Sequence, residues 1–319
     1  LKIKKMKLGL GTAALGRPQY INVRLKNGEK SDLEAFKKNS FSVLETAYNK
    51  GIRYFDTAPG YGLAEALVLE WLQTKNDASI QIATKWGYTY TANFDENAIV
   101  HEVKEHSLAK LNAQWNFSKQ LLPYLKVYQI HSATIETGVL ENSKVLERLA
   151  SLKKEHNLKI GLTTTGTNQA EVIKKALNIT VDGASLFDLF QVTYNFLDQS
   201  ILEVSEELIH ENKSIVIKEA LANGRVFRNE SYPHYNKMYE VLEGISKKHN
   251  VGVDAISLKY CEQTVPNSIV LSGASTNAQL KQNLQLNTFS LSNNEIELLN
   301  SFKIAPEFYW KERKQLIWN

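Results

Sequence analysis

Four polar residues of this sequence stand at or near the ends of short apolar segments, and their types could together protonate and polarise a carbonyl oxygen. Asp56, Lys85 and His131 each end a different segment, and Tyr61 lies on a tight turn a few residues after Asp56. If the segments are strands of one parallel sheet or barrel, their ends meet at one edge. The Asp and the Lys would then have to pair, because an unpaired charge in an apolar environment is strongly destabilising.

A lysine charge beside a tyrosine favours the phenolate, so we expect Lys85 to lower the pKa of Tyr61 from about 10 toward neutrality. Tyr61 is then a general acid for a carbonyl oxygen, and a neutral His131 could donate a second hydrogen bond to the same oxygen. Taken singly, Asp56 could be a helix cap, Lys85 a solvated rim residue, His131 a buried histidine and Tyr61 a packing residue. The four together favour a functional site.

The elements that would position these residues are eight short, β-rich apolar segments, each followed by a longer stretch of helical periodicity. Their lack of polar alternation is typical of parallel strands buried on both faces. Eight strand–helix units in 319 residues predict an α/β fold, a closed (β/α)8 TIM barrel with long loops at the C-terminal mouth of the strands. A doubly wound sheet with a second domain is the alternative. The segments are residues 7–11, 53–58, 80–85, 126–131, 159–163, 189–194, 214–218 and 268–272.

We expect one domain over residues 1–319, with no linker. Amphipathic helices are predicted over residues 32–49 and 143–157, and Asn168 is a suitable N-cap for the helix after the fifth strand. Long loops at 16–30 and 222–237 and a tail at 304–319 would lie around the mouth, where barrels place binding residues.

Composition excludes several classes of protein. With 43% hydrophobic and 23% charged residues the chain is a folded globular protein rather than a disordered or fibrous one. Its 38 basic and 34 acidic residues are too evenly matched to indicate nucleic-acid binding. The single cysteine, Cys261, cannot form an internal disulfide, and no apolar run is long enough to span a membrane.

We therefore expect a cytoplasmic protein without membrane or nucleic-acid partners. No metal site is expected, since His131 has no second ligand at a suitable spacing. The oligomeric state stays open.

Two phosphate-binding patterns near the N-terminus are rejected. Residues 9–14 satisfy G-x-G-x-x-A, but a dinucleotide fingerprint needs a helix to begin there. Gly16, Pro18 and a polar loop follow, so we expect no helix at this point. The P-loop pattern G-x-x-x-x-G-K-[ST] and the hydrolase pattern G-x-S-x-G are absent from the sequence.

The segment Gly51-Ile52-Arg53-Tyr54-Phe55-Asp56-Thr57-Ala58-Pro59-Gly60-Tyr61-Gly62, with Glu65 after it, resembles the signature of the aldo-keto reductase superfamily. Lys85 and His131 follow in the order and spacing of that family, and the resemblance covers nearly the whole chain. It implies a barrel that binds a nicotinamide cofactor in an extended pose without a Rossmann domain. It also implies a catalytic tetrad of Asp56, Tyr61, Lys85 and His131, with Tyr61 as the acid.

The resemblance further implies a set of cofactor-binding positions. Thr163 and Thr164 align with a Ser-Asn pair that holds the nicotinamide carboxamide, and Thr164 lacks the amide. Gln191 matches a glutamine that bonds the same carboxamide, and Lys218 stands where many relatives stack an aromatic ring on the nicotinamide. The full set is Gly11, Thr12, Thr163, Thr164, Gln191, Lys218, Glu219, Ala220, Leu221, Gly224, Arg225, Gly273, Ser275, Gln279, Gln282 and Asn283, of which Asn283 would face the adenine.

The resemblance implies NADPH/NADP+ as the cofactor and leaves NADH open. Some relatives bind the 2′-phosphate with basic residues, because the dianion is stabilised by an arginine guanidinium or a lysine ammonium. Gly273 and Gln279 stand at those positions here. Arg225 or Lys281 could substitute.

The expected function is NAD(P)(H)-dependent interconversion of a carbonyl compound (aldehyde, ketone or sugar) and an alcohol. Tyr20, Trp86 and Tyr88, with residues 308–310, could line an aromatic pocket for a small-molecule substrate. Two alternatives remain. One is a cofactor-binding regulatory or redox-sensing subunit with little turnover, and the other is lyase or isomerase chemistry on the same barrel.

Overall fold

The computed structural model describes residues 7–17, 33–95 and 97–317. Eight parallel strands close into a barrel in the order β1-β12-β11-β10-β7-β6-β3-β2. This confirms the predicted TIM barrel, and the closed sheet excludes the doubly wound alternative. Every predicted strand is present, and each end lies within two residues of its expected position. The barrel strands are β1 (Leu8–Gly11), β2 (Tyr54–Asp56), β3 (Gln81–Trp86), β6 (Leu125–Ala133), β7 (Lys159–Thr164), β10 (Leu189–Thr193), β11 (Ser214–Lys218) and β12 (Ile269–Ser272).

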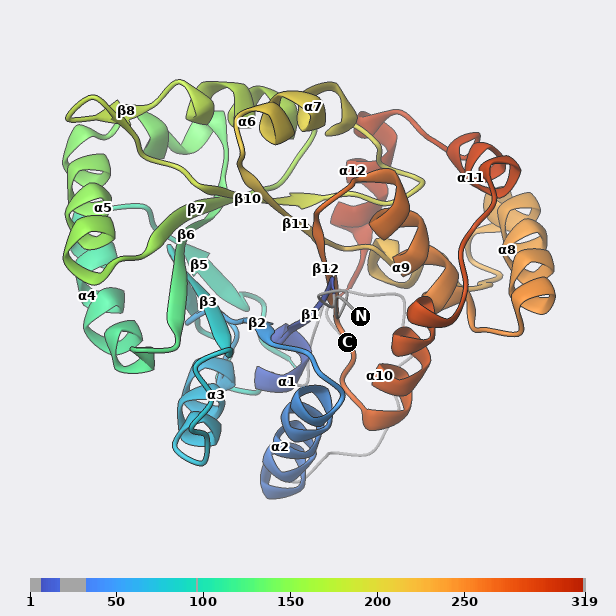
Figure 1. Ribbon diagram of the computed structural model, residues 1–319, viewed down its shortest axis with the longest axis horizontal. Helices are drawn as coiled ribbons and strands as arrows, with labels where there is room; N and C mark the ends of the chain where they lie inside the picture. The colour runs from blue at the N-terminus through green and yellow to red at the C-terminus, as the bar shows by residue number, and fades with distance from the viewer. Residues whose placement is uncertain (1–6, 18–32, 96, 318–319) are drawn as a thin grey trace, which may run out of the picture.

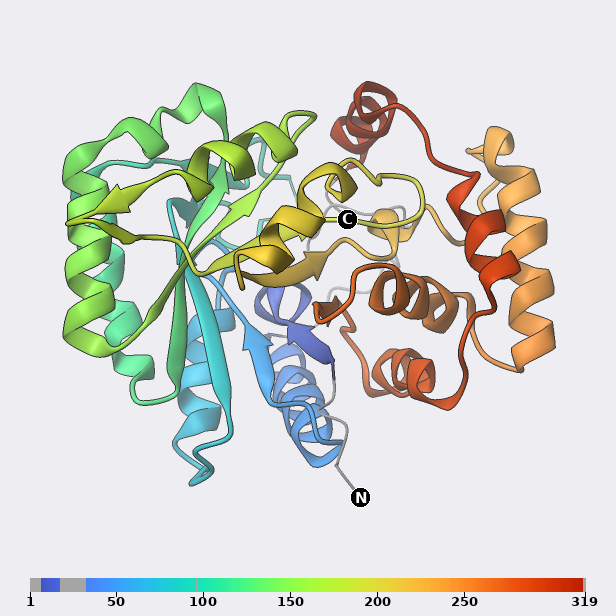
Figure 2. The ribbon, with the colours of Figure 1, turned by 45° about the horizontal axis from the view of Figure 1, so that its top comes forward.

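Helices form the outer layer of the molecule (Figure 1). Two of them, α2 and α5, match the amphipathic segments predicted from the sequence. The connection from β11 to β12 contains both α8 and α9, and in both views α8 and α11 lie at the same edge of the molecule (Figures 1 and 2). The helices are α1 (Ala13–Gly16), α2 (Leu33–Asn49), α3 (Ala64–Leu72), α4 (Leu108–Ser118), α5 (Ser143–His156), α6 (Gln169–Leu177), α7 (Leu202–His210), α8 (Asn236–His249), α9 (Val253–Thr264), α10 (Asn277–Asn283), α11 (Asn293–Asn300) and α12 (Pro306–Gln315).

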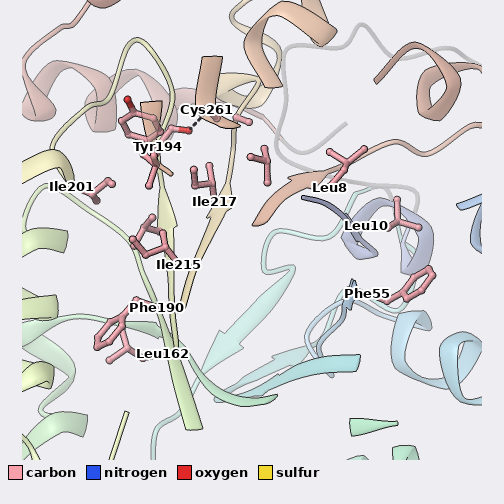
Figure 3. Packing of buried hydrophobic residues seen from close by; sticks show 14 of the residues in the cluster. Leu8, Leu10, Phe55, Leu162, Phe190, Tyr194, Ile201, Ile215, Ile217 and Cys261 are labelled. Atoms are coloured by element: carbon pink, nitrogen blue, oxygen red, sulfur yellow. Dashed lines mark hydrogen bonds between the residues drawn. The ribbon is translucent and has the colours of Figure 1, made fainter. Parts of the chain in front are cut away.

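Side chains along each strand alternate between two separate cores, as the pleat of a strand requires. One set packs between the strands and the helices, where Leu10, Phe55 and Ile217 lie (Figure 3). The other set fills the barrel interior with the side chains of Tyr54, Ala83, Val127, Leu189, Val216 and Leu271. The residue two positions beyond each interior side chain therefore also faces inward, one layer closer to the mouth.

The segment after β1 corrects one prediction. A helix does begin there: α1 covers Ala13–Gly16, a single turn that ends at Gly16. The rejection of a Rossmann site still stands, because β1 is a strand of the closed barrel and the next residue, Arg17, is extended. Asn168 occupies the N-cap position of α6 as predicted, but its side chain makes no capping hydrogen bond. Instead the Thr167 hydroxyl donates to the Asn168 side-chain oxygen (3.0 Å).

The loops between the barrel strands contain more secondary structure than the sequence predicted. The predicted loop at 16–30 falls largely on residues 18–32, outside the described residues. The loop at 222–237 contains two short 3-10 turns, Ala222–Gly224 and Pro233–Tyr235. The tail contains α12. An unpredicted insertion after β3 forms the antiparallel hairpin β4 (Tyr88–Tyr90) and β5 (Glu102–Lys104), and β8 (Thr180–Val181) pairs with β9 (Ala184–Ser185).

None of the helices in the described part of the chain has the length and apolar character that crossing a membrane requires.

Candidate active site

The floor of the candidate site is a layer of polar side chains on top of the apolar barrel interior. Each member lies two positions beyond an interior apolar residue, so the period of the strand turns all of them toward the mouth. Asp56 follows Tyr54, Lys85 follows Ala83, and Lys218 follows Val216. We call this set the polar layer; its members are Asp56, Lys85, Gln129, Gln191 and Lys218.

Asp56 is the centre of the polar layer and is held by side chains from three other strands, β3, β6 and β10. The Lys85 ammonium bonds to Asp56 Oδ1 and also donates to the Thr57 carbonyl (3.0 Å). Gln129 Nε2 (3.2 Å) and Gln191 Nε2 (2.7 Å) both donate to Asp56 Oδ2. Lys85 is 0% exposed and Asp56 2% exposed. The pairing predicted from the burial cost of the two charges is confirmed.

The turn that carries Tyr61 is fixed by a close approach of α1. Leu63 N donates to the Gly16 carbonyl (2.8 Å), and Tyr61 N donates to the Ala58 carbonyl (3.0 Å). A Cβ atom at Gly16 would lie 1.9 Å from the Tyr61 carbonyl oxygen. Only glycine therefore allows the end of α1 to pack against this turn.

The structure brings Tyr61, Lys85 and His131 together over Asp56. Lys85 Nζ lies 4.7 Å from the centroid of the Tyr61 ring. The rings of Tyr61 and His131 are perpendicular (87°), with centroids 5.5 Å apart. The Tyr88 ring, from β4, lies 4.7 Å from the His131 ring on another side. A half-buried phenol, a buried ammonium and an imidazole thus share one end of the barrel.

The pKa of Tyr61 lies well above its ordinary value, mainly because the phenol is surrounded by protein and also because of the Asp56 charge. This is opposite to the predicted lowering by Lys85. The main reason is burial, which disfavours a charged phenolate, and the nearby Asp56 carboxylate disfavours it further. The Arg17 charge opposes the shift without reversing it. Tyr61 therefore keeps its proton at neutral pH and is ready to donate it.

His131 is neutral, as predicted. Burial and the charges of Lys85 and Lys218 lower its pKa well below the ordinary value. Its carbonyl oxygen is bonded to His106 Nε2 (2.9 Å), which ties the end of β6 to the segment after β5. A neutral imidazole has one N–H to donate. His131 can therefore donate a hydrogen bond at the mouth without adding a charge.

Two residues of the site were not predicted. Arg17 is 2% exposed, and its Nη1 donates to the Gly60 carbonyl (2.9 Å) and to Glu102 Oε2 (3.0 Å). Its guanidinium carbon lies 5.6 Å from the centroid of the Tyr61 ring. Nothing in the local pattern indicates this role, because the contact joins the residue after α1 to the β4–β5 hairpin. Gln129 carried a signal: it stands two positions before His131 on the same strand and so faces the same way.

The predicted carboxamide partners provide a complementary set of donors and acceptors. Thr163 Oγ1 accepts from Ser132 N (2.7 Å), and its own proton has no acceptor among the described residues. Gln191 donates through Nε2 to Asp56 and keeps its Oε1 as an acceptor. A carboxamide needs a donor for its oxygen and an acceptor for its NH2 group. Thr163 and Gln191, adjacent in the β7–β10 register, fit that requirement.

Three other predicted cofactor residues use their side chains to hold the barrel. The Thr164 hydroxyl is buried and donates to Gln169 Oε1 (3.1 Å). Thr12 Oγ1 donates to the Asp56 carbonyl (3.0 Å), which joins the end of β1 to β2. The Ser272 hydroxyl donates to the Asn283 amide oxygen (2.8 Å), and Asn283 is only 3% exposed. These side chains are already satisfied by protein partners.

The loop after β11 contains an ion-pair network that reaches the C-terminal helix. Glu219 accepts from Nε and Nη2 of Arg313, and Lys218 Nζ donates to Thr193 Oγ1 (2.7 Å). Arg225 is 0% exposed, pairs with Glu312 Oε2 (3.1 Å) and lies over the Tyr309 ring. This corrects the suggestion that Arg225 could hold a 2′-phosphate. Its guanidinium is buried and already paired with the Glu312 carboxylate of α12. Ala220 is buried, whereas Leu221 and Gly224 are partly exposed on the same loop.

The loop after β12 leaves open space at the edge of the mouth. A Cβ on Gly273 would meet no atom of the described residues within 4 Å. Ser275 N donates to Gln279 Oε1 (2.9 Å), and the Ser275 carbonyl accepts from Asn39 Nδ2 (2.8 Å). Gln282, one turn further along α10, is exposed. Gly11, at the end of β1, is partly exposed beside this loop, and its Cβ position lies 3.6 Å from the Ser272 carbonyl.

The predicted aromatic pocket is only partly present. Tyr88 lies beside His131, as described above. Trp86 is 0% exposed and packs against His106 in the outer core, which contradicts its predicted place in the pocket. The reason is the alternation of the strand: Lys85 faces inward, so Trp86 must face outward. Tyr20 lies outside the described residues.

Comparison with known proteins places the chain in a family. The sequence model described as "Aldo/keto reductase family" matches residues 7–304. The chain belongs to the aldo/keto reductase family. It is therefore an NAD(P)-dependent oxidoreductase, which agrees with the resemblance seen in the sequence.

Individual relatives of this aldo/keto reductase are distant. A D-threo-aldose 1-dehydrogenase of a Pseudomonas species is 24% identical over 279 residues, covering 77% of this chain and 82% of the relative. An NADP(+) aryl-alcohol dehydrogenase of Phanerodontia chrysosporium is 23% identical over 299 residues, covering 83% and 76%. The solved structure of an aldo-keto reductase from Bacillus halodurans, in its holo form, matches with a TM-score of 0.69 at 22% identity and covers 94% and 92%. This likeness shows the shared fold.

Proposed function

We propose that this aldo/keto reductase interconverts a small carbonyl compound and its alcohol, with Tyr61 as the general acid and base of the reaction. The observation that carries the proposal is the meeting of Tyr61, Lys85 and His131 over Asp56 at the barrel mouth. A proton donor and a neutral hydrogen-bond donor lie side by side there. Such a pair can bind one carbonyl oxygen and stabilise the charge that develops on it.

In the reducing direction each residue has one task. The nicotinamide, when bound, supplies the hydride. The Tyr61 hydroxyl donates its proton to the oxygen that becomes the alcohol, and His131 holds that oxygen by its own N–H. Lys85 stabilises the phenolate left on Tyr61, since its ammonium lies 4.7 Å from the ring. Asp56 keeps Lys85 charged and in place. In the oxidising direction the same proton returns from the alcohol to Tyr61.

The cofactor is held at the same mouth. Thr163 and Gln191 would bind its carboxamide, on the donor and acceptor arrangement described above. We expect NADPH to bind, and NADH to bind with comparable strength, because Gly273 and Gln279 offer no cation to a 2′-phosphate. Titration of both reduced forms at equal ionic strength measures the preference. A preference for NADPH above about a hundredfold would contradict this expectation.

The substrate class is a small aldehyde, ketone or sugar. Tyr88 provides one aromatic wall beside His131, and two relatives are named for the oxidation of an aldose and of an aryl alcohol.

The test is the variant Tyr61→Phe, assayed with a panel of aldehydes and sugars by nicotinamide absorbance. Loss of general acid catalysis should lower kcat by about a thousandfold, while cofactor affinity stays near wild type. Tyr90→Phe is a matched control, since the Tyr90 ring also lies near the Arg17 guanidinium (5.7 Å) and its hydroxyl accepts from Phe94 N (3.0 Å). Unchanged activity of Tyr61→Phe would remove Tyr61 as the acid. Tight cofactor binding by the wild type without turnover would instead support a regulatory role.

A further inference from the structure

Lys218 is the one cation of the polar layer that the proposed proton transfer does not use. It ends β11, two positions beyond Val216 of the barrel interior, so its side chain starts from the inward face at the mouth. Its partner in register is Thr193 of β10. Lys218 thus belongs to the same layer as Asp56 and Lys85, on the strand that pairs with the Gln191 strand.

The charge of Lys218 is only weakly balanced by its neighbours. Within the described parts of the chain its one hydrogen bond is with a neutral group, the Thr193 hydroxyl (2.7 Å). The nearest carboxylate, Glu219, is 3.8 Å away and is already bound by two nitrogens of Arg313. Lys85 has its own carboxylate in Asp56. Lys218 therefore shares the Glu219 carboxylate with Arg313, which lies closer to it (2.7 Å against 3.8 Å).

The surroundings of Lys218 leave it charged at neutral pH. Burial lowers its pKa to about 8, with smaller contributions from Arg313 and Lys85, and the Glu219 charge opposes the shift. Asp198 also opposes it, although the Asp198 carboxylate bonds to Ser200 and Gln169 rather than to Lys218. The field of Lys218 reaches the reacting groups, because it contributes to the lowered pKa of His131.

A positive charge at this place distinguishes the two states of a nicotinamide. The ring is neutral when reduced and cationic when oxidised. This inference rests on the proposed function, which requires the nicotinamide ring to lie at the mouth. The ring must be close enough to transfer a hydride to the carbonyl carbon while Tyr61 and His131 contact the carbonyl oxygen. We propose that Lys218 makes this enzyme bind the reduced cofactor in preference to the oxidised one, and so biases the site toward carbonyl reduction.

The expected effect is measurable. Two unit charges that share one barrel mouth of low effective dielectric constant repel enough to shift a binding constant by about tenfold or more. The oxidised and reduced forms differ by one ring charge in both the NAD and the NADP pair. The ratio of their dissociation constants therefore reports the effect whichever pair the enzyme prefers.

The experiment measures Kd for the oxidised and reduced forms of both pairs by calorimetry, with wild type, Lys218→Met and Lys159→Met. Lys159 lies at the opposite end of the barrel, at the start of β7, and serves as the control for a lost charge. In Lys218→Met the ratio of oxidised to reduced Kd should fall at least about tenfold, and in Lys159→Met it should stay at the wild-type value. Lys218→Gln gives a second neutral variant, and Lys218→Arg should retain the wild-type ratio.

A pH series on the wild type gives an independent measure that needs no substitution. The protonated ammonium repels the oxidised ring, so the Kd ratio should fall as pH rises from 7 to 9.5, and Lys218→Met should show no such fall. The pKa of Glu219 is lowered to about 2, that of His131 is also lowered, and that of Tyr61 is raised, so these three groups do not titrate in this window.

The outcomes separate the inference from the function on which it rests. An unchanged Kd ratio in both neutral variants, with wild type binding cofactor and reducing carbonyls, overturns the role of Lys218 alone. Failure of the wild type to bind either form of either cofactor overturns the proposed function, and the inference with it. A ratio that falls equally in Lys159→Met shows a general charge effect and also overturns the role of Lys218.

Discussion

Replacing Asp56 by Asn should destabilise the fold far more than the removal of a surface charge does. Asp56 accepts from Lys85 on one oxygen and from Gln129 and Gln191 on the other. An amide at this place has only one oxygen, so in either orientation its NH2 group faces a donor. Lys85, 0% exposed, also loses the carboxylate that balances its charge.

The size of the effect follows from the burial of the pair. Removing one partner of a buried ion pair costs about 3–5 kcal/mol, mostly because the other charge stays buried. Domains are stable by only about 5–15 kcal/mol, so Asp56→Asn should lose a large share of the total. Removing both charges in Asp56→Asn with Lys85→Met relieves that penalty. The double variant should therefore be about 2–3 kcal/mol more stable than the sum of the two single changes predicts.

Urea unfolding of the wild type, both single variants and the double variant measures this coupling energy. The control is Glu203→Gln, which breaks the ion pair with Lys174 (3.1 Å) on the surface, where the side chains are 59% and 52% exposed. That change should cost about 0.5 kcal/mol or less. The reasoning is refuted if Asp56→Asn costs no more than the control, or if the two single changes are additive.

Two further predictions concern groups near the barrel wall. Burial raises the pKa of Glu65 to about 7, while Thr84 and Ser118 donate to its Oε1. Between pH 4.5 and 7 the Glu65 carboxyl is ionised in the unfolded chain but still protonated in the folded protein. The folded state therefore binds more protons, and the free energy of unfolding falls as pH rises through this range. Glu65→Gln should therefore raise the free energy of unfolding by about 2–3 kcal/mol at pH 8 and have little effect at pH 4.5; an equal effect at both pH values contradicts the argument. Arg225→Met should expose α12 to trypsin, because Arg225 anchors Glu312, yet leave the ratio of NADPH to NADH affinity unchanged. A changed ratio would show that Arg225 contributes to binding of the 2′-phosphate after all.

The barrel was predictable because its signals are local. Short apolar strands and amphipathic helices repeat eight times, and each unit carries its own periodicity. The β4–β5 hairpin was missed because the segment between β3 and α4 has no clear period. Trp86 was misplaced for a different reason. The prediction placed Trp86 in the pocket because it follows Lys85 at a strand end. Side chains alternate along a strand, however, so an inward Lys85 turns Trp86 outward.

The site divides in the same way. Asp56, Tyr61, Lys85 and His131 could be named from the sequence because strand ends of a parallel barrel converge, whatever the details of packing. Arg17 could not, since its contacts with Gly60 and Glu102 join segments 43 and 85 residues apart. The role of Arg225 could not be assigned either, because its partner lies 87 residues away on α12.

The sequence by itself determined the strand–helix order, the residues at the mouth and the need for Asp56 and Lys85 to pair. Those conclusions depend on periodicity and on the cost of burying a charge, both of which are properties of residue type. The tertiary structure alone decided how those charges act. It surrounds Tyr61 with protein and sets Asp56 against Lys85, so the pKa of Tyr61 rises where the residue types suggested a fall. The sign of a pKa shift depends on burial and on every neighbouring charge, and these are known only once distant segments are packed together.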